Sequence, residues 1–144
     1  MDTGSIILMD SLVIGDDETS GELFPRVAEF GAQLLIKALD EIHAGTATRT
    51  PQDDSLATHA PMLKREDGKI DWGKPGQEIV NLVRGLNPWP SAYFELNGEQ
   101  IKVHKARVMH GKLELLEVQA PNSRRMSWRD FANGRRLDGN INFD

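Results

Sequence analysis

The pattern of apolar and polar positions divides the chain into a first part with one long helix and a second part that mixes helices and strands. Residues 5–14 contain two stretches rich in Ile and Val, which is typical of a strand, and a polar turn follows them. From Leu23 to Ile42, apolar residues recur with a helical period, and Gly45 is a C-terminal stop signal. We therefore expect a strand followed by a long helix with a wide apolar face.

The segment that follows, residues 46–69, has no periodicity and is rich in Thr, Asp and Pro. This composition is typical of a linker or of a strap that lies over a surface. Because a structureless loop of this length is unusual inside one compact domain, we place a domain boundary here. We expect a first domain over residues 1–45, a linker over residues 46–69 and a second domain over residues 70–144.

The second domain begins with a helical pattern and continues with three strand patterns. Apolar residues share one helical face over residues 75–86, and the proline at the start suits a first helical turn. Asn97-Gly98 separates the first two strands and is a strong type I′ hairpin signal. In the third strand both faces carry apolar residues, so this strand is central or bulged. The expected strands are Ala92–Leu96, Gln100–Val108 and Lys112–Gln119.

Two short segments complete the pattern. A hinge of Asn87, Pro88, Trp89 and Pro90 fixes the backbone where the helix meets the sheet, because each proline restricts its own φ and the residue before it. We expect Trp89 to plug the core rather than to contact a ligand. A final short helix is expected over residues 127–134, with Ser127 in a capping box and a glycine stop at its end.

The composition excludes several classes of site and partner. The chain has 144 residues, 39% hydrophobic and 27% charged, and no cysteine, which excludes disulfides and thiolate metal sites. No apolar run approaches the roughly 20 residues of a membrane helix, and the N-terminus has no secretory signal. The four histidines show no metal-ligand spacing. We therefore expect neither a metal nor a membrane partner.

Charge is distributed unevenly along the chain. The net charge is −5, yet residues 1–72 carry 14 acidic and 6 basic residues whereas residues 73–144 carry 8 acidic and 11 basic residues. Basic residues around strands can follow a phosphate backbone by charge alone, although each of them could equally serve only to solvate the surface. The basic residues on or beside the predicted sheet are Lys102, Lys105, Arg107, Lys112, Arg124, Arg125, Arg129, Arg135 and Arg136.

Seven segments, taken in order, resemble methionyl-tRNA formyltransferases, and they cover nearly the whole chain. They are DTGSIIL, ETSGELFPRVAEFGAQLL, TPQDDSLATHAP, DGKIDW, VRGLNPWPSAY, IKVHKARV and RRMSWRDFANGRRL. Related formyltransferases that act on nucleotide sugars share the IDW and PWP signatures. The LNPWP context and the C-terminal segment favour the tRNA enzyme.

The resemblance implies a fold and a reaction. The family has a Rossmann-like formyl-transfer domain, a connecting strap and an OB-like β-barrel. It moves a formyl group from 10-formyltetrahydrofolate to the amino group of methionyl initiator tRNA. Asp2 matches the family's catalytic Asp in its D-T-G motif, and a carboxylate can hold the tautomer and charge of an imidazole. The Asn and His partners belong to an N-x-H-x-S-L-L-P segment that is not in this sequence.

The chain also departs from the family pattern in its second domain. IKVHKARVM runs almost directly into HGKLELLEVQ, where family members have further barrel strands. Three strands cannot close a barrel of five, so open edges that could pair with another chain are expected, although the family is monomeric. The expected fold is therefore α+β. It comprises the tail of a Rossmann-like formyltransferase domain (strand plus long helix), a strap linker, and an incomplete OB-like barrel with flanking helices.

These observations lead to one functional expectation and three alternatives. We expect the C-terminal portion of a methionyl-tRNA formyltransferase, cytoplasmic in a bacterium or organellar in a eukaryote, that alone binds no folate and transfers no formyl group. The alternatives are a stand-alone OB-type tRNA-binding module, the tail of a sugar-nucleotide formyltransferase, and a truncated product without function. Initiator tRNA is the expected partner, and the candidate contacts are Lys102, Lys105, Arg107, Lys112, Arg124 and Arg125.

Overall fold

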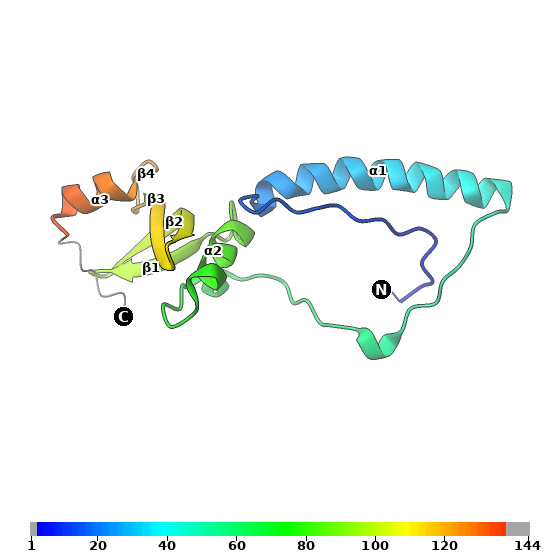
Figure 1. Cartoon of the computed structure of the whole chain (residues 1–144), viewed down its shortest axis with the longest axis horizontal. Coiled ribbons are helices and arrows are strands. Elements are labelled where there is room, and N and C mark those ends of the chain that lie inside the picture. The colour runs from blue at the N-terminus through cyan, green and yellow to red at the C-terminus, as the bar shows by residue number, and fades with distance from the viewer. Residues whose placement is uncertain (1–2, 138–144) are drawn as a thin grey trace. The chain divides into compact units, whose positions relative to one another are not determined.

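The computed structural model describes residues 3–137, and the chain divides into two compact units. The first unit comprises Met1–Asp16 and Glu22–Met62, and the second comprises Asp17–Gly21 and Leu63–Asp144. Figure 1 shows the elements along the chain. They are α1 (Ser20–Ala44), the 3-10 helices η1 (Asp54–Leu56) and η2 (Arg65–Gly68), α2 (Gly76–Gly85), β1 (Ala92–Leu96), β2 (Glu99–Met109), β3 (Lys112–Gln119), β4 (Met126–Ser127) and α3 (Trp128–Arg135).

The first unit is dominated by α1, which confirms the long helix predicted from its periodicity. Gly45 follows it with φ +70° and ends it as predicted. The N–H of Gly45 donates to the carbonyl of Ile42 at 3.1 Å, and the N–H of Thr46 donates to that of Glu41 at 3.0 Å. These two bonds form a Schellman motif, which satisfies carbonyls that the end of a helix leaves unpaired.

The apolar face of α1 is exposed in this chain. No residue of α1 is buried, and the side chain of Phe24 remains 68% exposed. The periodic pattern therefore forms the helix without enclosing a core. The other large apolar residues of α1 that are exposed are Val27, Leu35, Ile36, Leu39 and Ile42.

The prediction of a strand over residues 5–14 is wrong. Ile6 exchanges two backbone hydrogen bonds with Thr50, at 2.8 and 2.9 Å, and within residues 3–137 this isolated bridge is the only β-pairing of the segment. A strand exists only as part of a ladder of such bonds, so apolar sequence alone does not create one. Val13 and Ile14 accordingly remain exposed.

The second unit contains a four-stranded antiparallel open sheet with the order β1-β2-β3-β4. The three strands expected from the sequence are confirmed. The sequence reading missed β4, because two residues are too few to show alternation. Asn97 and Gly98 have φ values of 51° and 79°, which confirms the predicted type I′ turn, and His110-Gly111 forms a similar turn with 51° and 73°.

The β2–β3 pair carries one bulge on each strand, and these bulges offset one another. The register joins Val103 to Val118, skips His104 on β2, and resumes with Lys105 opposite Glu117. It then skips Leu116 on β3, so that the original register returns at Ala106 and Leu115. The third strand, which was predicted to be central or bulged, is both: it lies between β2 and β4 and carries a bulge, and a second bulge lies opposite it in β2.

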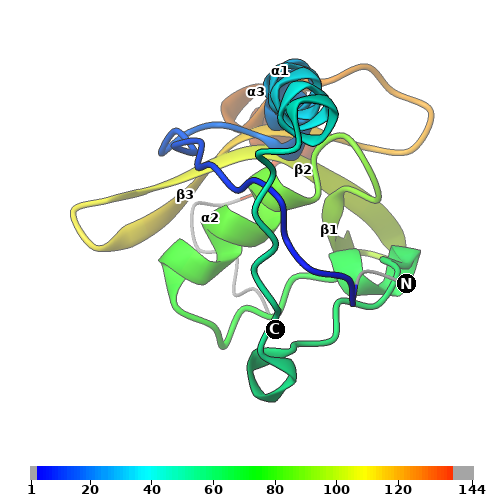
Figure 2. The same cartoon turned by 90° about the vertical axis from the view of Figure 1, so that its right-hand side faces the viewer.

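One face of the sheet forms the core of the second unit. Helix α2 packs against β2 and β3 (Figure 2), and α3 contacts β3 and β4. The largest fully buried side chains are Val83 from α2 and Ile101, Val103 and Val118 from the strands. Phe94 is 3% exposed and makes edge-on ring contacts with Trp72 and Trp128 at centroid distances of 5.5 and 6.3 Å.

The hinge is anchored by its polar residues, and the prediction that Trp89 plugs the core is wrong. The side-chain amide of Asn87 donates to the carbonyl of His104 at 3.1 Å, and the N–H of Ser91 donates to that of Leu86 at 2.9 Å. The hydroxyl of Ser91 donates to the carbonyl of Pro88 at 2.8 Å. These bonds fix the loop from its ends. Trp89 remains 57% exposed, and the aromatic residues in or against the core are Trp72, Phe94, Trp128 and Phe131.

Helix α3 begins as predicted and ends later than predicted. The Ser127 hydroxyl oxygen accepts from the N–H of Asp130 at 3.0 Å, which confirms the N-cap. Gly134 does not stop the helix: it lies inside α3, and Arg136 takes the left-handed conformation with φ 51°. The guanidinium of Arg135 lies 5.2 Å from the ring centre of Phe131, so the last turn is held by side-chain packing.

Candidate nucleic-acid interface

The face of the sheet opposite the core carries several of the predicted basic residues. Lys102 precedes buried Val103, and Arg107 follows buried Ala106, so alternation places both basic side chains on the outer face. Five positions separate them, and an unbroken strand would put them on opposite faces. The bulge at His104 changes this parity and brings the two cations to one face.

Acidic neighbours neutralise part of this face. Both the Nε and an Nη atom of Arg107 lie 2.8 Å from one carboxylate oxygen of Glu114. Arg125 lies 3.5 Å from Glu117, which also faces Lys105 in the register. Because exposed ion pairs of this kind contribute little to stability, their main effect here is on the charge of the surface. Within residues 3–137, no ion pair involves Lys102, Lys105, Lys112 or Arg124.

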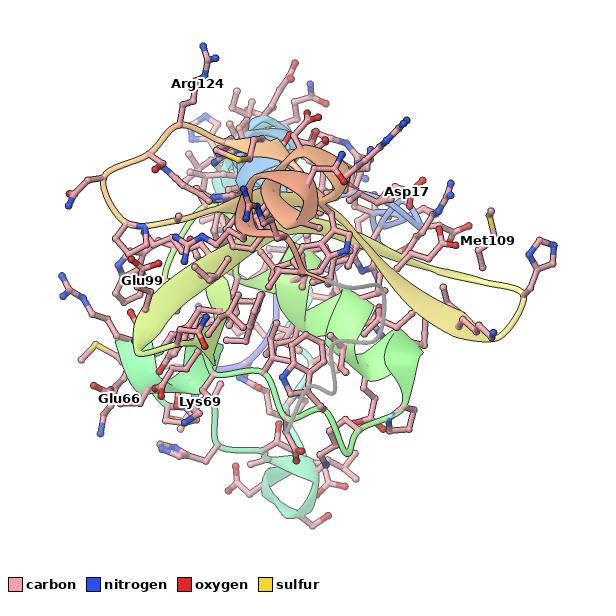
Figure 3. The ribbon with its side chains drawn as sticks, turned by 90° about the vertical axis from the view of Figure 1, so that its left-hand side faces the viewer. Asp17, Glu66, Lys69, Glu99, Met109 and Arg124 are labelled. Carbon is pink, nitrogen blue, oxygen red and sulfur yellow. The ribbon has the colours of Figure 1, made fainter. Side chains whose placement is uncertain are left out.

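The candidate residues fall at two ends of the sheet. Lys112 begins β3 at the hairpin end, near Arg107, whereas Arg124 and Arg125 lie in the connection from β3 to β4 at the other end. Lys102 pairs in register with Gln119, the last residue of β3, and so belongs to the second group. Figure 3 shows Arg124 pointing away from the ribbon, with Met109 at the other end of the hairpin. We call Lys102, Arg124 and Arg125 the basic end.

His104 lies beneath the basic end, and sequence reasoning did not identify its role. Its side chain is 6% exposed, and Nε2 lies 2.9 Å from Oε1 of Gln119. The amide nitrogen of Gln119 in turn donates to the carbonyl of Ser123 at 2.8 Å. No signal in the sequence indicated this role, because the bulge that makes room for the buried imidazole depends on how β2 pairs with β3.

The environment of His104 favours its neutral form. Burial is the main cause that lowers the pKa of the imidazole below its ordinary value of 6.5, and the positive charges of Arg125 and Lys102 lower it further. The hydrogen bond to Gln119 and the negative charge of Glu117 act in the opposite direction but are outweighed. A neutral ring therefore sits between exposed cations.

Two further groups of predicted residues have different outcomes. Asp2, the predicted catalytic residue, lies outside the described residues, so its role stays a prediction. Arg135 forms an ion pair with Glu99 and covers the ring of Phe131, which ties its guanidinium to the fold. Within residues 3–137, no three His, Asp or Glu side chains gather as a metal site, and no helix combines the length and hydropathy needed to cross a membrane.

Comparison with known proteins confirms the resemblance seen in the sequence. Residues 62–112 match the family described as formyl transferase, C-terminal domain. The methionyl-tRNA formyltransferase of Solibacter usitatus is 41% identical to this chain, with 97% of the chain and 52% of that protein aligned. The enzyme of the same name from Geobacter metallireducens is 38% identical, with 98% and 52% aligned.

A solved structure supports the same fold. Methionyl-tRNA formyltransferase from Clostridium thermocellum superimposes with a TM-score of 0.63 at 21% identity, covering 83% of this chain and 50% of that one. The chain thus spans about half the length of the relatives it matches. The Solibacter alignment runs over 162 residues although this chain has 144, so that relative contains residues that this chain lacks between the aligned segments.

Proposed function

Starting from this similarity to the C-terminal half of methionyl-tRNA formyltransferases, we propose that the chain supplies the RNA-holding part of such an enzyme. Its partner is the methionyl initiator tRNA, and the contact is made by the outer face of the sheet. The second unit is then an OB-like domain that is shortened between β2 and β3. The first unit, with α1, is the tail of the Rossmann-like formyl-transfer domain.

One observation carries the proposal: the paired bulges bring cations of β2 to one exposed face that carries no core residues. Lys102 and Arg107 share this face, and the basic end adds two arginines from the loop after β3. Of the two aromatic residues of the first hairpin, Phe94 is buried in the core, whereas Tyr93 is half-buried and lies opposite Lys102 in the register, so base stacking from this hairpin could use only the ring of Tyr93. Recognition therefore rests mainly on phosphate charge and on the shape of the RNA.

Binding of fluorescein-labelled initiator tRNA across a salt series tests the proposal. We expect the logarithm of the affinity to fall linearly with the logarithm of the salt concentration, because bound cations displace counterions from the RNA. Lys102→Gln should lower the slope by about 1 and weaken binding to all tRNAs alike. A slope near zero, or no binding at low salt, would contradict the proposal.

We further propose that the chain alone neither binds 10-formyltetrahydrofolate nor transfers its formyl group. Asp2 is the only residue that matches the family's catalytic set, and one carboxylate cannot replace the amide and imidazole that belong with it. Titration calorimetry with 10-formyltetrahydrofolate and a formylation assay on methionyl initiator tRNA address the two parts separately. Turnover above the rate without protein would refute the second part.

The assignment to tRNA rather than to a nucleotide sugar is tested in the same assay. A nucleotide sugar presents two phosphates, whereas tRNA presents a continuous backbone, so the extended basic face favours the tRNA. We expect millimolar uridine diphosphate sugar to leave tRNA binding unchanged apart from its ionic strength. Competition beyond that effect would favour the sugar-nucleotide alternative.

A further inference from the structure

We propose that the hydrogen-bonded chain His104–Gln119–Ser123 is a positioning device that holds the arginine loop, residues 120–125, in the conformation that presents Arg124 and Arg125 to RNA. The inference rests on the proposed RNA-binding function. It adds to that function a buried side chain that touches no RNA itself.

The donor and the acceptor of each hydrogen bond in the series His104–Gln119–Ser123 can be assigned by starting from the Ser123 carbonyl. A carbonyl oxygen can only accept, so Nε2 of Gln119 is the donor to the Ser123 carbonyl at 2.8 Å. Oε1 of Gln119 therefore faces His104, and it accepts from the Nε2–H of the imidazole at 2.9 Å. The neutral ring is fixed as the Nε2–H tautomer, and each bond in the series has a defined donor.

The second ring nitrogen of His104 explains why the ring stays neutral. Nδ1 is buried, and within residues 3–137 no hydrogen-bond partner reaches it. A proton on Nδ1 would add a positive charge with no acceptor, close to the cations Lys102 and Arg125. A neutral His104 thus donates one hydrogen bond and adds no charge to the repulsion between its basic neighbours.

The arginine loop is tied to the sheet at its two ends, where Ala120 is buried in the core and the side chain of Arg125 pairs with Glu117 of β3 at 3.5 Å. Between these ends, the N–H of Ser123 donates to the carbonyl of Ala120 at 3.2 Å, and Asn122 takes the left-handed conformation with φ 56°. Both of these features shape the turn from within. The bond from Gln119 to Ser123 joins the middle of the loop to the end of β3, and His104 holds the Gln119 side chain in place. Without the bond from Gln119 to Ser123, the loop would become ordered only when RNA binds, and this ordering would lower the affinity.

Two substitutions at one position separate the hydrogen bond from the bulk of the side chain. His104→Leu keeps an apolar body but removes the donor to Gln119. His104→Gln retains an amide nitrogen that reaches about as far from the backbone as Nε2 and does not titrate. His110→Gln, at the exposed turn of the hairpin, is the matched control outside the chain of bonds. All variants are made in the full chain.

The first readout is tRNA binding over a salt series, with fluorescein-labelled initiator tRNA as the probe. We expect His104→Leu to weaken binding about 3- to 10-fold and to lower the salt slope by about 1 to 2, since two phosphate contacts lose their order. His104→Gln should restore both values, and His110→Gln should change neither. Equal losses in His104→Leu and His104→Gln would overturn the proposal.

A double-mutant cycle separates positioning from general destabilisation. In the Arg124→Gln/Arg125→Gln background, His104→Leu should cause no further loss of affinity, because the side chains that it positions are gone. In the Lys102→Gln background it should cause its full loss, since Lys102 lies on β2 and not on the loop. An undiminished effect in the arginine-free background would show a merely structural role and refute the proposal.

Amide hydrogen exchange distinguishes failure of this inference from failure of RNA binding itself. His104→Leu, and not His104→Gln, should increase exchange within residues 120–125 while β1 keeps its protection. Unchanged exchange in the loop would refute the positioning role whether or not the chain binds tRNA. If the loop responds as expected but the wild-type chain binds no tRNA, the proposed function fails, and with it the RNA-binding part of this inference.

Discussion

In α1 a long series of apolar residues lies exposed, whereas in the second unit a similar supply of apolar residues is enclosed. Leu35 and Leu39 of α1 are 59% and 55% exposed, but Ile101 and Val118 in the sheet are 0% exposed. The difference shows what each kind of pattern achieves. A helical period satisfies the backbone locally, whereas burial requires elements far apart in the sequence to close on one another. Function and measurable cooperativity should therefore reside in the second unit.

The strongest test of this difference between the two units is to truncate one apolar side chain in each of them and to compare the loss of stability. Ile101→Ala should destabilise the second unit by about 2 to 5 kcal/mol, because it leaves a cavity in the core. Leu35→Ala should cost less than about 0.5 kcal/mol, since that side chain is mostly exposed already. Urea unfolding followed by fluorescence measures the second unit alone, because Trp72, Trp89 and Trp128 all belong to it. If the two variants shifted the urea midpoint equally, the contrast between an enclosed core in the second unit and an exposed apolar face on α1 would be contradicted.

Replacing a glycine with alanine should change stability in opposite directions in the two units. A Cβ at Gly68 would clash with the backbone carbonyl oxygen of Ser91, so Gly68→Ala should destabilise the second unit by about 1 to 3 kcal/mol. A Cβ at Gly31, inside α1, would meet nothing within 4 Å. Gly31→Ala should therefore stabilise the helix by about 0.5 to 1 kcal/mol.

Two spectroscopic signals distinguish the effects of Gly68→Ala and Gly31→Ala. Thermal melts followed by circular dichroism at the helical minimum report mainly on α1, and tryptophan fluorescence reports on the second unit. Gly68→Ala should lower the fluorescence midpoint, and Gly31→Ala should leave it unchanged while it raises the helical signal. A loss of helical signal in Gly31→Ala would show that α1 packs against something at that position.

The smallest expected effect is a dependence of stability on pH that only the second unit shows. The pKa of His104 lies below its unfolded value of 6.5, so the unfolded chain binds the proton more readily than the folded one. The contribution of the neutral ring is therefore complete above pH 6.5 and is lost as the pH falls from there toward the folded pKa. Urea midpoints between pH 7.5 and 5 should show this decline in the wild type and in His110→Gln. In His104→Gln the decline should be weaker, and an unchanged decline would assign it to other groups.

Much of the fold could be predicted because it follows from local pattern. The period of α1, the stop at Gly45, the Asn97-Gly98 turn and the cap at Ser127 each depend on a few neighbouring residues. The strand expected near Ile6 could not be excluded from the sequence, since its formation depends on partners elsewhere. The position of Trp89 was equally hidden, because the other aromatic rings that fill the core come from separate segments. The predicted division at residues 46–69 stays a prediction.

The candidate site was predictable in its charge and not in its arrangement. The sequence contains the basic residues, but which of them face acids depends on the register, as the pairing of Arg107 with Glu114 shows. The bond from His104 to Gln119 joins residues on neighbouring strands, and it forms only because a bulge turns the imidazole into a protected position. A single-sequence pattern contains no signal for such a bond.

The two bulges mark the places where the β2–β3 hairpin can lose a residue. Deletion of His104 would leave an unbroken strand in which Lys102 and Arg107 are four positions apart and still share a face, and deletion of Leu116 would likewise restore regular alternation in β3. Deletion of Val103 or Ala106, with the bulge kept, would instead put Lys102 and Arg107 on opposite faces. Among close homologues, single-residue changes in the length of these strands should therefore occur at the bulges and not elsewhere in the strands.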